Sequence, residues 1–202
     1  NKWYHYMGNS SEVPVQDQQG QFRRTTEVRG DALKLLADLS NAEIRDVTLV
    51  AYHKWCITRR FLTDIDTSRN IIVTVGEQLA NYSGWPENTR FHLENFKPAL
   101  DEPGEWFLSR EGTLYYKPRP GEDMTKADVF APAAEKLIVF EGKPEAGQFV
   151  EHINLKGLVF EHNSRLLPRT GYAPYQAAFV TEAAVIARVG DSGRAMFPLL
   201  LF

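Results

Sequence analysis

The chain has 202 residues, of which 43% are hydrophobic and 24% are charged, and its 23 Lys and Arg against 26 Asp and Glu give a formal net charge of −3. These ordinary globular values exclude a disordered acidic tail and a nucleic-acid binder that works by bulk positive charge. The single cysteine, Cys56, excludes an intramolecular disulfide and a cysteine-cluster metal site. The longest apolar run, at residues 195–202, is far shorter than the roughly 20 residues of a membrane-spanning helix, so we expect no membrane partner.

The first 46 residues consist of a segment without periodicity and a segment with helix signals. Residues 1–30 show little hydrophobic periodicity, and we expect them to be irregular. The chain begins with Asn1 rather than Met and shows no signal-peptide pattern, so we expect a piece of a longer protein or a processed product. Ser40 and Glu43 have the S-x-x-E spacing of a capping box, which predicts one or two short helices near residues 31–46.

The segment that continues to residue 128 has the composition of β-structure. Its β-branched and aromatic runs are separated by turn residues, which is typical of short strands. Residues 106–118 predict a hairpin, because Gly112 can take the left-handed conformation that a short hairpin loop needs. A short helical turn is expected near Phe96–Leu100. The other predicted strands lie within residues 47–53, 55–66, 71–75 and 90–95.

The last third of the chain contains short apolar runs separated by glycine and polar turns. The runs at 137–142 and 152–163 are similar in shape and stand roughly 20 residues apart, which is the coil length of a solenoid of parallel strands. We therefore expect the first coils of a parallel β-helix at residues 129–190. The apolar tail at residues 191–202 is atypical of such a coil.

Four segments carry a resemblance to a known family. The runs EWFLSREGTLYYKPRPGEDMTKADVFAPAAEKLIVFEG, INLKGLVFEHN and LPRTGYAPYQAA resemble right-handed parallel β-helix proteins of bacterial polysaccharide breakdown, in the glycoside-hydrolase branch of the pectin-lyase-like superfamily. The run DVTLVAYHKWCITRRFLTDID is similar to a β-rich segment inserted before the main coils in that branch. The resemblance covers roughly residues 31–187 and rests on the order and spacing of these segments.

The resemblance implies a mostly β fold, in which a β-rich segment with a hairpin precedes the first β-helix coils. It also implies a glycan or polysaccharide as partner and a secreted or periplasmic location in a bacterium. In that family the acids that cleave the sugar lie in later coils, which this chain does not contain. The resemblance therefore describes an N-terminal part of a glycoside-hydrolase-like protein.

A glycosidase needs two carboxyl groups roughly 5–10 Å apart. We interpret Asp64 with Asp66 as a strand end and Glu122 with Asp123 as a solvated turn, and no candidate pair stands out as catalytic. The catalytic residues therefore stay unknown, and we predict no glycosidase turnover by this chain alone. The pairs considered are Asp64 with Asp66, Asp101 with Glu102, Glu122 with Asp123, and Glu161 with Glu151.

Aromatic rings stack on the C–H faces of sugars, so aromatic residues in loops are the candidate substrate-binding residues. Trp85, Tyr172 and Tyr175 lie in predicted loops. His162 joins them because the resemblance carries a histidine at that position, although a histidine bonded to a loop carbonyl is the alternative. No zinc-site spacing, dinucleotide fingerprint or P-loop occurs, so we expect no metal and no cofactor.

Three hypotheses about function remain open from the sequence. The chain is part of a polysaccharide-degrading enzyme, or a non-catalytic carbohydrate-binding or structural module, or a truncated product without activity. In all three cases the apolar tail at residues 195–202 predicts a homo-oligomer formed through the C-terminal end, because six large apolar side chains gather there.

Overall fold

The computed structural model describes residues 4–54, 56–79, 84–173 and 184–189. These residues are mostly β, with one short α-helix and several short 3-10 helices, as the sequence predicts. The chain divides into two compact units. The first comprises Asn1–Ala127 with Leu167–Phe179, and the second comprises Asp128–Leu166 with Val180–Phe202.

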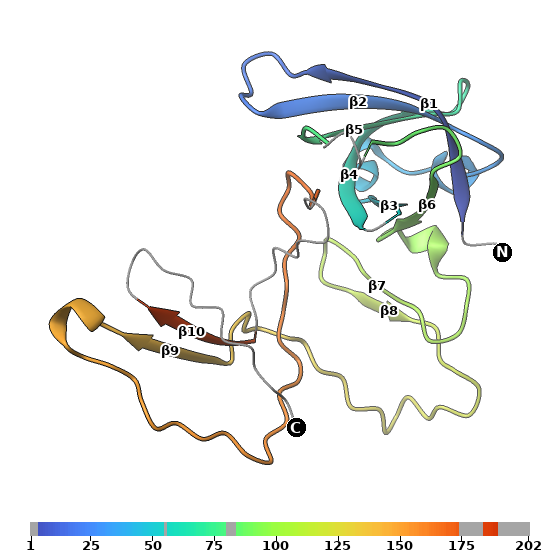
Figure 1. The fold of residues 1–202 in the computed structure, drawn as a ribbon. Helices are drawn as coiled ribbons and strands as arrows, with labels where there is room; N and C mark the ends of the chain where they lie inside the picture. The colour runs from blue at the N-terminus through green and yellow to red at the C-terminus, as the bar shows by residue number, and fades with distance from the viewer. Residues whose placement is uncertain (1–3, 55, 80–83, 174–183, 190–202) are drawn as a thin grey trace. The chain divides into compact units, whose positions relative to one another are not determined.

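Six antiparallel strands of the first unit close into a barrel in the order β1-β2-β5-β4-β3-β6 (Figure 1). Strand β1 pairs with β2 along one side and with β6 along the other, so the sheet closes on itself. Side chains fill the interior of so small a barrel. The strands are β1 (His5–Pro14), β2 (Gln21–Val28), β3 (Thr48–Tyr52), β4 (Ile57–Asp66), β5 (Ile71–Glu77) and β6 (Arg90–Glu94).

Strands β4 and β5 follow from the local sequence. Every second residue of each strand is buried over most of its length, as expected for a strand with one face toward a core. The predicted turn between them is confirmed. Asp66 Oδ1 accepts hydrogen bonds from the backbone N–H groups of Ser68 and Arg69, both at 3.0 Å. Asn70 takes a φ of 52°, a left-handed conformation that asparagine tolerates.

The prediction that residues 1–30 are irregular is wrong, because they form β1 and β2. The inward residues of β2 include Arg24 and Thr26, which are 8% and 0% exposed, so a buried strand face there is polar. Strand β1 contains a register shift between Met7 and Ser10, which interrupts the alternation of its side chains. A search for hydrophobic periodicity therefore misses both strands.

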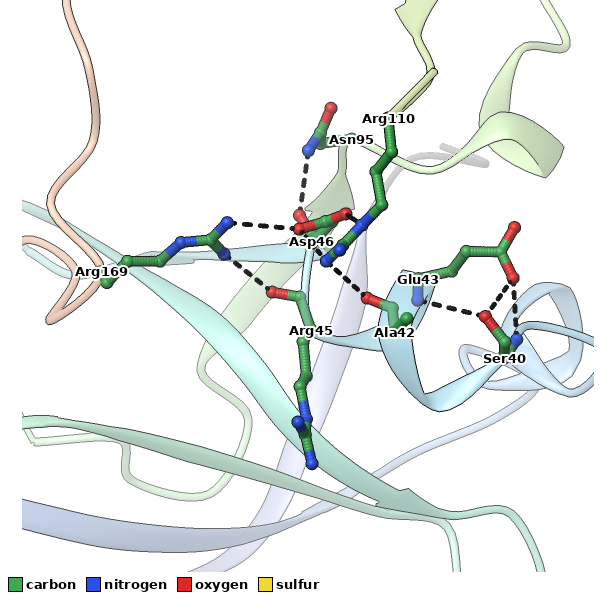
Figure 2. Close-up of polar contacts among 8 residues, drawn as sticks. All are labelled: Ser40, Ala42, Glu43, Arg45, Asp46, Asn95, Arg110 and Arg169. Atoms are coloured by element: carbon green, nitrogen blue, oxygen red, sulfur yellow. Dashed lines mark hydrogen bonds and ion pairs between the residues drawn. The ribbon is translucent and has the colours of Figure 1, made fainter.

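The short helices near residues 31–46 are confirmed. They are the 3-10 helix η1 (Lys34–Leu36) and the helix α1 (Asn41–Ile44), and each contributes a buried aliphatic side chain to the core. Ser40 Oγ accepts a hydrogen bond from the backbone N–H of Glu43 at 3.3 Å, while the Glu43 carboxylate accepts one from the Ser40 N–H at 2.8 Å (Figure 2). The capping box read from the sequence is therefore present.

A small hairpin and a helical turn follow the barrel strands, both as predicted. The 3-10 helix η3 (Lys97–Ala99) comes directly after β6. Strands β7 (Trp106–Leu108) and β8 (Leu114–Tyr116) pair antiparallel, and Gly112 in their connection has a φ of 84°. The hairpin thus uses the left-handed glycine that the sequence indicated.

The second unit contains one parallel pair of strands. Strand β9 (Ile138–Gly142) is followed by the 3-10 helix η4 (Pro144–Ala146) and pairs in register with β10 (Val185–Val189). Residues 149–166 contain no strand, so the coil expected at 152–163 is wrong. His152 and His162 both take left-handed φ values, 59° and 57°, which an extended strand cannot accommodate.

The expected parallel β-helix is therefore corrected: the described residues form a six-stranded antiparallel barrel and two separate two-stranded sheets. The whole tail at residues 191–202 lies outside the described residues, so the self-association through the tail stays a prediction. Within the described ranges, no helix is long and apolar enough to cross a membrane.

Two neighbouring leucines of η1 provide a matched test of the core. Leu36 is 0% exposed, whereas Leu35 is 52% exposed. We expect Leu36→Ala to lower the free energy of unfolding by about 2–5 kcal/mol, because it leaves a cavity in the core. Leu35→Ala should change it by only about 0.5 kcal/mol. Urea denaturation measures both values, and equal losses for the two variants would contradict the assigned core.

Candidate functional site

A groove with a volume of about 440 Å³ lies on the first unit, between β6 and the start of β7. Its walls come from β6, from the η3 turn and from the residues that lead into β7. The residues that line it include His92, Glu94, Phe96, Leu100, Glu105 and Trp106.

The alternation of β6 decides which of its side chains reach this groove. Phe91 is fully buried and Leu93 packs against the core, so the residues between and after them point outward. His92 and Glu94 therefore share the outer face of the barrel. Trp106, the first residue of β7, is 67% exposed, so most of its indole surface is available to a ligand.

A chain of polar contacts fixes the two outward side chains of β6. A hydrogen bond of 3.1 Å joins the Tyr52 hydroxyl to His92 Nδ1, and one of 2.7 Å joins His92 Nε2 to Glu94 Oε1. The second carboxylate oxygen of Glu94 accepts a hydrogen bond from the Arg59 guanidinium. All four side chains are partly buried, so the imidazole and the carboxylate are held in one orientation.

Burial and these contacts set the protonation states of Glu94 and Tyr52. Burial alone raises the pKa of Glu94, but the hydrogen bonds and charges of His92 and Arg59 outweigh it, so the pKa lies below its ordinary value. Burial raises the pKa of Tyr52, and its hydrogen bond with Tyr4 adds to that rise. Glu94 is therefore an ionised acceptor and Tyr52 a neutral hydroxyl near pH 7.

Asp46, just after α1, holds the hairpin that carries Trp106 (Figure 2). Arg110 in the hairpin loop binds both carboxylate oxygens of Asp46, and its Nη2 also donates to the Ala42 carbonyl at 3.1 Å. Asn95, which follows β6, donates to the Asp46 carbonyl at 3.0 Å. The same residue thus contacts the segments that form both sides of the groove.

Arg169 reaches the same carboxylate from another part of the chain, as Figure 2 shows. Its Nη2 lies 3.5 Å from Asp46 Oδ1, and its Nη1 donates to the Arg45 carbonyl at 3.3 Å. The Arg169 guanidinium also lies 4.8 Å from the centre of the Phe61 ring. We interpret this cluster as structural, because each of its polar groups already has a protein partner.

The groove combines an exposed indole with ionised and neutral hydrogen-bonding groups. Aromatic faces pack against the C–H surface of a pyranose ring, and carboxylates accept hydrogen bonds from sugar hydroxyl groups. A site with an aromatic platform and a few fixed polar groups is typical of small-ligand recognition. The arrangement is suited to binding a polar, uncharged ring.

The position of Trp85 does not fit its predicted stacking on a glycan. Trp85 is 3% exposed and lies inside the barrel unit. The guanidinium groups of Arg24 and Arg60 lie 5.2 and 5.8 Å from the centre of its ring. Its loop residues Ser83, Gly84 and Pro86 suggested exposure, but tertiary packing has turned the indole inward.

Two other candidates have structural partners. The backbone of Tyr172 forms an antiparallel bridge with Arg59, with N–O distances of 2.7 and 2.8 Å. His162 belongs to the second unit, where its ring stacks on Phe130 at 4.6 Å and its Nε2 lies 3.5 Å from Glu161. Tyr175 lies outside the described residues. Binding by His162 and Tyr172 stays a prediction.

Two of the candidate carboxylates, those of Asp66 and Glu122, accept hydrogen bonds within their own turns. Asp66 accepts four hydrogen bonds from Ser68 and Arg69, which lower its pKa strongly. Glu122 accepts hydrogen bonds from the Tyr116 hydroxyl at 2.5 Å and the Arg119 N–H at 2.8 Å. These partners favour the interpretation of both pairs as turn residues.

Sequence reasoning missed the groove. The alternation of RFHLEN places His92 and Glu94 on one face, which is a signal the sequence does contain. The approach of Trp106 to that face depends on the intervening turns, which the alternation cannot predict. Among the described residues, no group of three or more His, Cys, Asp or Glu side chains is placed to hold a metal ion.

No family model and no curated protein matches the chain. A similar solved structure carries the name "Glycoside hydrolase", with 19% sequence identity and a TM-score of 0.46. The similarity covers 71% of this chain and 28% of that one, so the chain spans little more than a quarter of that protein's length. A likeness at this level does not bear on the function of this chain.

The Glu94 contacts predict a pH dependence of stability. The folded-state pKa of Glu94 lies below its ordinary value of 4.5, so the ionised carboxylate stabilises the fold above that pH, and the contribution is lost as the pH falls through the folded-state pKa. We expect Glu94→Gln to be less stable than the parent near pH 7. Denaturation titrations should show that the difference shrinks from about pH 5 to pH 3.

Glu87→Gln is the matched control, because the Glu87 carboxylate is 59% exposed in its ion pair with Arg29. Its stability difference should be small and nearly constant over the same range. A constant difference for Glu94→Gln as well would contradict the stabilising role of the ionised Glu94.

Proposed function

We propose that the chain is a carbohydrate-binding part of a polysaccharide-degrading protein, and that the groove between β6 and β7 takes the glycan. The observation that carries this proposal is the exposed indole of Trp106 in the groove that the fixed His92 and Glu94 side chains also line. Trp106 pairs with Tyr116 across the hairpin, which leaves most of its indole free for a ligand, and an indole in a groove with polar side chains suits a sugar ring.

Binding is favoured over hydrolysis by the state of the carboxyl groups. A general acid that protonates a glycosidic oxygen near pH 7 needs a raised pKa. In the described residues, every carboxyl group whose pKa departs clearly from its ordinary value has a lowered one. Glu94 is also engaged through both oxygens, to His92 and Arg59.

We infer the fold and location of the whole protein from the sequence resemblance. The segments between residues 31 and 187 resemble β-helix glycoside hydrolases, and the strands of a β-helix pair parallel, as β9 and β10 do. A β-helix parent and a secreted or periplasmic bacterial location belong to this proposal. The enzymatic alternative is that the chain itself hydrolyses a glycan.

Substitution of Trp106 tests the proposed glycan site. A panel of plant and algal polysaccharides on affinity gels first identifies one that retains the unsubstituted 202-residue chain. We expect Trp106→Ala to abolish retention on that gel. The loss of one stacking contact should weaken binding roughly tenfold or more. Stability should change little, because the indole is mostly exposed.

Leu166→Ala is the control, since Leu166 is a similarly exposed large apolar residue of the second unit. It should leave retention unchanged. Equal retention of Trp106→Ala and the parent would reject the groove as the binding site. If the unsubstituted chain releases reducing ends from a glycan and substitution of Glu94 removes that activity, the enzymatic alternative would replace the binding function.

A further inference from the structure

The interior of the barrel is charged at one end. Arg24 on β2 and Arg60 on β4 both face inward, and their side chains are 9% and 0% exposed. Both guanidinium groups lie within 6 Å of the centre of the Trp85 ring. Thr74 on β5 stands directly opposite Arg24 and is fully buried. These four side chains define the charged end of the barrel.

The carboxylate of Glu12 neutralises Arg24. Arg24 Nη2 lies 2.9 Å from Glu12 Oε2, and Arg24 Nε donates to Glu12 Oε1 at 3.2 Å. Arg24 Nη1 donates to the Ser10 hydroxyl at 3.0 Å. All three guanidinium nitrogens of Arg24 therefore have partners inside the barrel.

Arg60 has no such neutralising partner at hydrogen-bond distance. Its Nη2 donates to the Glu77 carbonyl, but its Nη1 is 3.8 Å from Glu12 Oε1, which is too long for a hydrogen bond. Glu77 itself is exposed, so its carboxylate acts on Arg60 through solvent. Two buried guanidinium groups thus share one interior carboxylate.

Residues of the charged end carry buried side-chain atoms without a hydrogen-bond partner. They are Arg60 Nε, Arg60 Nη1, Thr74 Oγ1 and Trp85 Nε1, all without a hydrogen-bond partner among the described residues. The first two and the last are donors only. Gly76 lines the same spot, because a Cβ on it would lie 3.1 Å from Arg60 Nε.

We propose that the charged end of the barrel binds one small inorganic anion of the size of chloride, held by Arg60 with Trp85 Nε1 and the Thr74 hydroxyl as further donors. A buried guanidinium whose nearest carboxylate already pairs with another arginine is destabilising, and donors without acceptors add to that cost. A water molecule could accept some of these hydrogen bonds but could not neutralise the second guanidinium.

The direction of the Arg60 pKa agrees with this arrangement. Burial lowers the pKa of Arg60 to about 10, and Glu12 only partly opposes that effect. A bound anion would raise the pKa again, because it favours the charged form.

Thermal unfolding of the full chain tests the site when sodium chloride replaces sodium gluconate at constant ionic strength. We expect chloride to raise the melting temperature saturably, since an ion that binds only the folded state shifts the unfolding equilibrium. At a chloride concentration 100 times the dissociation constant, the unfolding constant should fall roughly 100-fold. Identical unfolding in chloride and gluconate would overturn the proposal.

Two threonine variants make the test specific without removing a buried charge. Thr74→Val preserves shape and removes an unpartnered hydroxyl, so chloride should bind roughly tenfold more weakly. Thr26→Val is the matched control, because the buried Thr26 hydroxyl already bonds Ser10 at 2.8 Å. It should lower stability without changing the chloride dependence.

The line width of ³⁵Cl magnetic resonance gives a direct readout, because bound chloride broadens the line. The parent and Thr26→Val should broaden the line equally, and Thr74→Val should broaden it less. Equal broadening by Thr74→Val and the parent would reject this site as the place where chloride binds.

Discussion

The closure of the barrel by β1 is the constraint on which the rest of the first unit depends. Because β1 pairs with both β2 and β6, none of the six strands is left as an open edge over these pairings. A barrel this small must be filled by its own side chains. Closure of the sheet therefore determines which side chains point into the barrel. The side chains between them face solvent or a ligand.

Two glycines allow a later segment of the first unit to pack against strands β4 and β5. A Cβ on Gly76 would lie 2.6 Å from the Thr170 carbonyl oxygen, and one on Gly171 would lie 2.5 Å from that of Arg59. Gly171 also has a φ of 79°. Only glycine permits the segment that contains Thr170 to lie directly against these strands, where Tyr172 pairs with Arg59.

The two faces of the barrel strands have separate chemical roles. The inner face of β4 presents Arg60, beside the unpartnered donors of the charged end. The outer face of the same strand presents Arg59, which fixes Glu94 in the groove between β6 and β7. Consecutive arginines thus belong to two separate clusters, because successive side chains of a strand point to opposite faces. Asp46 links the hairpin to the end of β6, because its carboxylate binds Arg110 and its carbonyl accepts a hydrogen bond from Asn95 (Figure 2).

The sequence by itself determined the elements that rest on local signals. The Ser40–Glu43 capping box, the Gly112 hairpin, and strands β3 to β6 follow from short-range hydrogen bonding, backbone preference and side-chain alternation. Only the tertiary structure decided that residues 5–14 and 21–28 are strands, that Trp85 is buried, and that Trp106 lines the same groove as Glu94. The physical reason is that a barrel interior can be polar when its charges have partners, so Arg24 and Thr26 fill positions that periodicity assigns to apolar residues. The expected β-helix coil failed for a related reason: apolar spacing specifies an interval along the chain, whereas strands also need an extended backbone, which His152 and His162 do not have.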